Sequence, residues 1–187
     1  MMSDRRYVAV VGGANTDVHG QADSPLIEQD SNPGRVRIVP GGVARNVAEN
    51  LARLGVTVRF ISAIGADDNG RMLTQAGREA GIDMDLVQVS DELPTATYLS
   101  ILDSNGEMAL AVSDMEIIEQ INVEQLAGCE DALRQAALLV IDANLGDDAL
   151  AWLIGAVDNK ELFVDTVSTS KALRIKPYLA SVHTLKT

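Results

Sequence analysis

Two polar residues follow the first strand-like run of the sequence. Asn15 and Asp17 come just after residues 7–11, and in an extended segment their spacing of two places both side chains on the same face. A carboxylate beside a carboxamide supplies strong acceptors and a donor, which suits a pair of vicinal hydroxyl groups. Asn and Asp also populate ordinary turns. These residues alone therefore leave a sugar-binding site and a simple turn as equal alternatives.

A pair of glycines marks a second place where a ligand could bind. Gly41 and Gly42 lead directly into a helical pattern that carries Asn46, so the backbone can approach a ligand and the helix start offers free N–H groups. A tight turn without a ligand is the alternative. Neither GxxxxGK[ST] nor GxGxxG occurs in the chain, so no nucleotide-binding loop is recognisable.

Other residue types that carry chemistry are sparse. Asn144 follows the strand-like run 138–141, where ligands of open α/β sheets bind. The two histidines, His19 and His183, lie far apart without ligands at zinc-binding spacing, so we expect no metal site. The single cysteine, Cys129, excludes a disulfide within the chain.

The elements that must position these residues alternate between strands and helices. Apolar periodicity predicts helices over residues 44–54, 70–80, 123–137 and 147–157. Short β-branched runs predict strands at residues 7–11, 56–64, 138–141, 162–164 and 182–185. This order predicts an α/β fold of one domain, residues 1–187, with a doubly wound, mostly parallel sheet and helices on both faces.

One stretch departs from this alternation. Residues 95–112 contain two strand-like runs joined by Asp103-Ser104-Asn105-Gly106, a strong hairpin signal. Together with residues 17–22 and 35–39, this hairpin predicts a small antiparallel sheet that stands off the main body as a lid.

Charge and hydropathy exclude some classes of partner. The formal net charge of −12 disfavours binding to a nucleic-acid polymer. No apolar run approaches the roughly 20 residues that span a bilayer, and the N-terminal residues do not read as a signal peptide. We therefore expect a cytoplasmic protein without a membrane partner.

Three segments together resemble a known family. They are GGANTD at residues 12–17, PGGVARNVAENLARLG at 40–55 and AIGADDNG at 63–70, and their order and spacing resemble those of the ribokinase-like (PfkB) carbohydrate kinases. Within that family, further segments resemble the pseudouridine kinases: DSNPGRVRIVPGGVARN at 30–46, TYLSILDSNGEM at 97–108, AVSDM at 111–115 and FVDTVSTSK at 163–171.

The resemblance implies roles for individual residues. Asp17 is expected to hold ribose hydroxyls, and the pocket is completed by Asn15, Gly41, Gly42 and Asn46. Contacts to the uracil base or its surroundings are expected from Asn32, Thr97, Asp114 and Lys171. The lid is expected to form a homodimer contact.

The resemblance also implies a reaction, the transfer of phosphate from ATP, with Mg²⁺, to the 5′-hydroxyl of pseudouridine. The family's Asn-x-x-Glu motif and the Gly-x-Gly-Asp motif with the general-base Asp are expected beyond Thr187, so the C-terminal catalytic part is missing. This chain is then the substrate-binding portion and is inactive alone. The alternatives are a kinase for ribose, inosine or adenosine, and a non-catalytic sugar-binding subunit.

Overall fold

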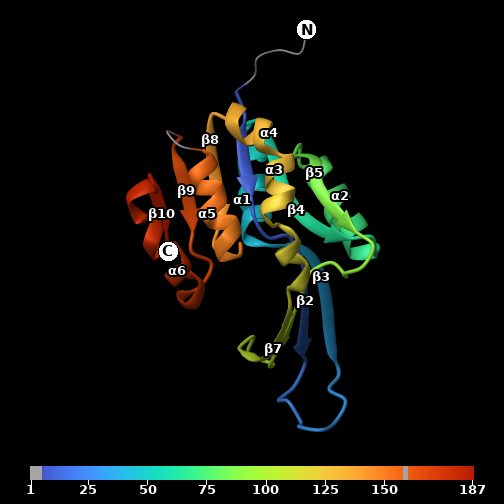
Figure 1. Ribbon diagram of the computed structural model, residues 1–187. Coiled ribbons are helices and arrows are strands. Elements are labelled where there is room, and N and C mark those ends of the chain that lie inside the picture. Colours follow the sequence, from blue (N-terminus) through green and yellow to red (C-terminus); the bar gives the residue numbers. More distant parts are fainter. Residues whose placement is uncertain (1–5, 158–159) are drawn as a thin grey trace.

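The computed structural model describes residues 6–157 and 160–187, and its centre is a six-stranded sheet (Figure 1). The strand order is β10-β9-β8-β1-β4-β5, and every neighbouring pair is parallel. The strands are β1 (Val8–Val11), β4 (Val58–Gly65), β5 (Asp83–Ser90), β8 (Leu138–Asp142), β9 (Leu162–Asp165) and β10 (Thr184–Lys186). The expected parallel sheet is confirmed.

Helices cover both faces of this sheet, as expected. On β1, Val8 and Val10 belong to one hydrophobic cluster and Ala9 and Val11 to the other, because alternate side chains point to opposite faces. The first cluster is covered by α1 (Val43–Arg53) and α2 (Asp68–Glu79). The second is covered by η1 (Glu116–Gln120), α3 (Val123–Gly128), α4 (Glu130–Gln135), α5 (Asp147–Ala156) and α6 (Thr169–Ile175), with η2 (Lys176–Ser181) beside α6.

Several elements differ from the prediction, which also lacked the short helices η1 and η2. Strand β5 was not predicted, because it lies at the sheet edge and its partly exposed residues include Asp83 and Asp85. The single helix predicted over 123–137 is two short helices, since Cys129 departs from helical geometry with φ −104° and ψ 7°. Helix α6 was also missed, because it is short and follows a run of Ser and Thr.

A second sheet stands apart from the main one and extends below it in Figure 1. It contains β2 (Asn15–Ala22), β3 (Gly34–Gly41), β6 (Thr97–Leu102) and β7 (Met108–Asp114), in the order β3-β2-β6-β7. The β2–β3 and β6–β7 pairs are antiparallel as expected. The β2–β6 pair is parallel, so the prediction of a wholly antiparallel lid is wrong. Strands β2 and β6 start side by side, where the Thr16 N–H donates to the Ala96 carbonyl at 2.8 Å. Both strands run from there away from the main sheet.

No helix within the described ranges is long and apolar enough to cross a membrane.

Candidate functional site

A cavity of about 360 Å³ lies where β1 ends, between the lid and the start of α1. It lies beyond the carboxyl end of a central strand, where ligands of open α/β sheets bind. Its lining comes from the lid, the start of α1 and the segments after β8 and β9: Gly13, Asn15, Asp17, His19, Gly42, Val43, Asn46, Tyr98, Ser113, Met115, Ile118, Asn144, Val167 and Lys171. We call this space the lid cavity.

Asp17 and Asn15 meet inside the lid cavity as their spacing predicted. The Asn15 amide Nδ2 donates to Asp17 Oδ1 at 2.6 Å, and Asn15 is buried. A Cβ at Gly41 would overlap the Asp17 carboxylate. Glycine at position 41 therefore leaves the space that the carboxylate fills, and Asn15 fixes the orientation of that carboxylate toward a ligand.

The start of α1 is shaped by Gly42, whose φ of +101° is a conformation that favours glycine. A Cβ there would also come within 2.7 Å of the Ala14 Cα. The Ala44 N–H donates to Asp142 and the Arg45 N–H to the Gly13 carbonyl, at 3.0 and 3.3 Å. The expectation that the helix start offers free N–H groups is therefore wrong for these two amides, because protein acceptors already occupy them.

Asp142, at the end of β8, is the main site feature that the sequence analysis missed. Its buried Oδ2 accepts from the N–H groups of Gly13 and Ala44 and from Asn144 Nδ2, while its Oδ1 accepts from the Asn144 N–H. Burial raises the pKa of Asp142, although these four hydrogen bonds favour the ionised form. The carboxylate joins three separate segments around the lid cavity. Its place at the end of a central strand, two residues before Asn144, was the available signal.

Lys171 reaches the lid cavity from α6. Its Nζ donates to Asn144 Oδ1 at 2.5 Å, which places an ammonium group between β8 and the lid. Burial lowers the pKa of Lys171, while the charge of Asp142 opposes that shift. The site therefore combines a carboxylate at Asp17 with a cation on the opposite wall.

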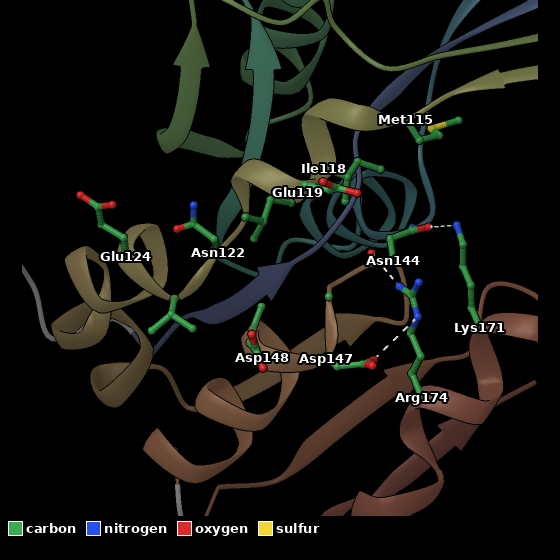
Figure 2. Close-up of a pocket in the computed structure, with 14 residues that line it drawn as sticks. Met115, Ile118, Glu119, Asn122, Glu124, Asn144, Asp147, Asp148, Lys171 and Arg174 are labelled. Carbon is green, nitrogen blue, oxygen red and sulfur yellow. Dashed lines mark hydrogen bonds and ion pairs between the residues drawn. The ribbon is translucent and has the colours of Figure 1, made fainter.

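A larger cavity of about 640 Å³ adjoins the lid cavity and shares Met115, Ile118, Asn144 and Lys171 with it. Figure 2 shows Lys171 pointing toward Asn144, and Arg174 lying beside Asn144 and Asp147. Its lining carries acidic side chains at Glu119, Glu124, Asp147 and Asp148. The two cavities meet at Asn144 and Lys171.

Three candidate residues lie outside the lid cavity. Asn32 is in the β2–β3 connection. Its Oδ1 accepts from the Ile27 N–H at 2.8 Å, and its Nδ2 donates to the Ile27 carbonyl at 2.9 Å. Thr97 and Asp114 are paired across β6 and β7, on the lid face opposite Tyr98 and Ser113. Strand alternation or loop closure directs these side chains away from the lid cavity, and their expected contacts to the uracil base or its surroundings stay predictions. Binding roles for the others stay predictions.

Within residues 6–157 and 160–187, no group of three or more His, Cys, Asp or Glu could hold a metal ion. The lid cavity is lined by the carboxylate of Asp17, the carboxamides of Asn15, Asn46 and Asn144, and the ammonium group of Lys171. Carboxylate, carboxamide and ammonium groups bind hydroxyls, and the glycines leave room for them.

The chain is similar in sequence and fold to known carbohydrate and nucleoside kinases. The profile of the pfkB family carbohydrate kinases matches residues 5–187. Pseudouridine kinase of Escherichia coli strain K12 is 39% identical over 185 residues, which are 99% of this chain and 59% of that enzyme. A carbohydrate kinase from Agrobacterium tumefaciens superposes with a TM-score of 0.87 at 30% identity, over 96% of this chain and 60% of that one.

The structure of Arabidopsis thaliana ribokinase complexed with ribose and ATP shares the fold. Its TM-score is 0.77 at 20% identity, over 86% of this chain and 53% of that one. The chain thus spans between half and two thirds of the length of these three proteins.

Proposed function

This chain belongs to the pfkB family of carbohydrate kinases, and we propose that it is the substrate-binding portion of a kinase that phosphorylates the 5′-hydroxyl of pseudouridine. The convergence of Asn15, Asp17, Gly42 and Asn46 on one cavity supports the ribosyl part of the proposal. The likeness to the E. coli enzyme supports the choice of nucleoside.

The residues of this chain bind and orient the ribosyl ring. Asp17, held by Asn15, accepts hydrogen bonds from two vicinal hydroxyls, and Asn46 contributes a carboxamide from the first turn of α1. Lys171 and Asn144 close the opposite wall, at the junction with the larger cavity. A ring held from both sides loses the freedom that would otherwise slow an attack by its exocyclic hydroxyl.

ATP and Mg²⁺ are the donor and the metal of the proposed reaction, and we propose that residues outside this chain form their sites. The chain has no phosphate-binding loop and no Gly-x-Gly-Asp motif. The described side chains also form no cluster suited to a metal ion. We therefore assign no step of phosphate transfer to residues of this chain and propose that the 187-residue chain alone does not turn over ATP.

Isothermal titration calorimetry of the chain with pseudouridine tests the binding proposal. Asp17→Asn removes the charged acceptor, and hydrogen bonds to charged groups contribute about 1.5–3 kcal/mol, so we expect affinity to fall about 10- to 100-fold. Asp114→Asn is the matched control, because Asp114 is exposed on the opposite face of the same sheet. Equal affinities of the unsubstituted chain and Asp17→Asn would contradict the assigned role of Asp17.

The same titration with inosine, adenosine and ribose compares the alternative substrates. Tighter binding of one of these than of pseudouridine would replace the nucleoside in the proposal. A coupled ATP-consumption assay completes the test: we expect no turnover above background, and robust turnover would refute the assignment of catalysis to residues outside this chain.

We also propose that the lid pairs with a second copy of the chain. The face of the lid that points away from the cavity is apolar and exposed; we call it the outer lid face, formed by Val36, Ile38, Leu99, Leu110 and Val112 around the half-buried Val18. Val36 is 72% exposed and Leu110 is 60% exposed. Contiguous exposed apolar surface of this kind is typical of protein–protein contacts.

Sedimentation equilibrium tests this pairing. We expect a dimer for the unsubstituted chain and a monomer for Ile38→Glu. Leu54→Glu is the control, because Leu54 is an equally apolar, 81% exposed residue at the end of α1. A monomer for the unsubstituted chain would contradict the pairing.

A further inference from the structure

The lid face that lines the cavity carries further residues besides Asn15 and Asp17, which are proposed to bind the ribosyl ring. The strand register places Tyr98 beside Asp17 and Ser100 beside His19 on this face, which we call the inner lid face. His19 and Tyr98 both line the lid cavity. Two residues of a strand span about 6.6 Å, so His19 lies one ring width farther along β2 than Asp17.

His19 is held in place by a buried hydroxyl. Its Nδ1 lies 2.6 Å from Ser100 Oγ, and Ser100 is 4% exposed. With Nδ1 engaged, Nε2 is the ring nitrogen left for a ligand, and no residue of the described part of the chain hydrogen bonds to it. The Ser100 hydroxyl can donate or accept, so Nε2 can present either an acceptor or a donor.

Tyr98 adds an aromatic surface next to this imidazole. Its hydroxyl donates to the Met108 sulfur at 3.5 Å. This hydrogen bond directs the ring along the lid, away from the carboxylate of Asp17 in the register position beside it. Tyr98 and His19 are diagonal neighbours across β6 and β2 on the face that lines the cavity, and a phenol ring together with an imidazole suits a flat, polar-edged heteroaromatic ring better than another hydroxylated carbon.

We propose that His19, positioned by Ser100 and flanked by Tyr98, forms a nucleobase subsite and sets the preference for a nucleoside over a simple riboside. A ligand whose vicinal hydroxyls lie on Asp17 places its C1 substituent toward His19. Nε2 then forms a hydrogen bond with the base, whose edge offers both imide N–H and carbonyl groups. This inference rests on the proposed ribosyl-binding function.

Titrations with two ligands test the subsite. Pseudouridine and methyl β-D-ribofuranoside share the ribosyl ring, but only the first carries a base. We expect His19→Ala to weaken pseudouridine binding about tenfold, which corresponds to about 1.4 kcal/mol, and to change methyl riboside binding less than twofold. Asp17→Asn should weaken the binding of both ligands.

Two further variants separate a contact from a structural role. His19→Gln keeps a polar group near the position of Nε2 and should restore most of the pseudouridine affinity. His183→Ala is the matched control, since His183 lies beside β10, where its Nδ1 is 2.9 Å from Thr184 Oγ1. Thermal melts of each variant show whether the fold is retained.

The outcomes distinguish the two levels of the proposal. If His19→Ala weakens both ligands equally or leaves pseudouridine binding unchanged, the nucleobase subsite is overturned while the ribosyl site stands. If the unsubstituted chain binds neither ligand, the proposed function is overturned and the subsite with it.

Discussion

Replacing Asp142 by Ala should destabilise the chain more than any other single change at the site. The buried carboxylate accepts hydrogen bonds from three backbone N–H groups, those of Gly13, Ala44 and Asn144, at 3.1, 3.0 and 3.1 Å. A buried donor left without a partner costs about 1–3 kcal/mol. The bonds from Gly13 and Ala44 are buried and the bond from Asn144 is only partly so, and the two buried donors alone should lower the free energy of unfolding of Asp142→Ala by about 2–6 kcal/mol, against a total of about 5–15 kcal/mol for a typical domain.

Asp165→Ala is a matched control at the end of the neighbouring strand. Asp165 is the register partner of Asp142 and is also buried, but it accepts from one backbone N–H, that of Val167 at 2.8 Å. Its other partner, Lys186, is exposed, and such pairs contribute little. Asp165→Ala should thus cost only about 1–3 kcal/mol.

Urea denaturation followed by fluorescence of Trp152, the single tryptophan, measures both changes. Trp152 packs against the second hydrophobic cluster and reports on the main sheet. If Asp142→Ala is too unstable to purify, Asp142→Asn, which can keep three of the four hydrogen bonds, should lie between it and the unsubstituted chain. Equal free energies of unfolding for Asp142→Ala and Asp165→Ala would refute the argument from hydrogen-bond count.

Three further predictions concern local features. Gly41→Ala should weaken pseudouridine binding by tenfold or more in calorimetry, because the added methyl overlaps the Asp17 carboxylate; unchanged affinity would contradict this. Gly155→Ala should raise the free energy of unfolding by about 0.5–1 kcal/mol, since a methyl there meets no atom within 4 Å and alanine favours the helix; destabilisation in urea would count against it. Burial raises the pKa of Asp67, but hydrogen bonds from the Thr95 hydroxyl and from two backbone N–H groups outweigh it, so the folded-state pKa is lowered. The stability that Asp67 adds relative to Asp67→Asn should therefore be present above the ordinary pKa of 3.8 and be lost as the pH falls through the folded-state value; a pH-independent difference in urea midpoints would contradict this.

The core of the fold could be predicted because its sequence pattern is local. The β-branched runs at β1 and β8 and the apolar stripe of α1 are each readable from neighbouring residues, and parallel pairing follows from their alternation. Strand β5 could not be predicted from its neighbouring residues. Its pairing with β4, which includes a register irregularity, is a tertiary contact that its own acidic residues do not indicate.

The same difference between local patterns and tertiary contacts applies to the residues of the candidate site. Asn15 and Asp17 were predictable because their spacing fixes their common face on any extended strand. The lid face that Thr97 and Asp114 occupy could not be predicted, because it depends on the register of β6 and β7, and a shift of one residue would move each side chain to the other face. The position of Asp142 at the end of β8 could have marked it as a site residue, but the backbone groups that it binds lie 98 and 129 residues away along the chain, so no local pattern indicates which segments it joins.

An NMR titration of the ¹⁵N-labelled chain with pseudouridine examines the proposed site directly. Backbone amide shifts should change most at Asn15, Asp17 and Gly42, with smaller changes at His19 and Tyr98. Shifts confined to the larger cavity near Asn122 and Glu124, or no shifts at saturating ligand, would contradict the assignment of the lid cavity as the ribosyl site.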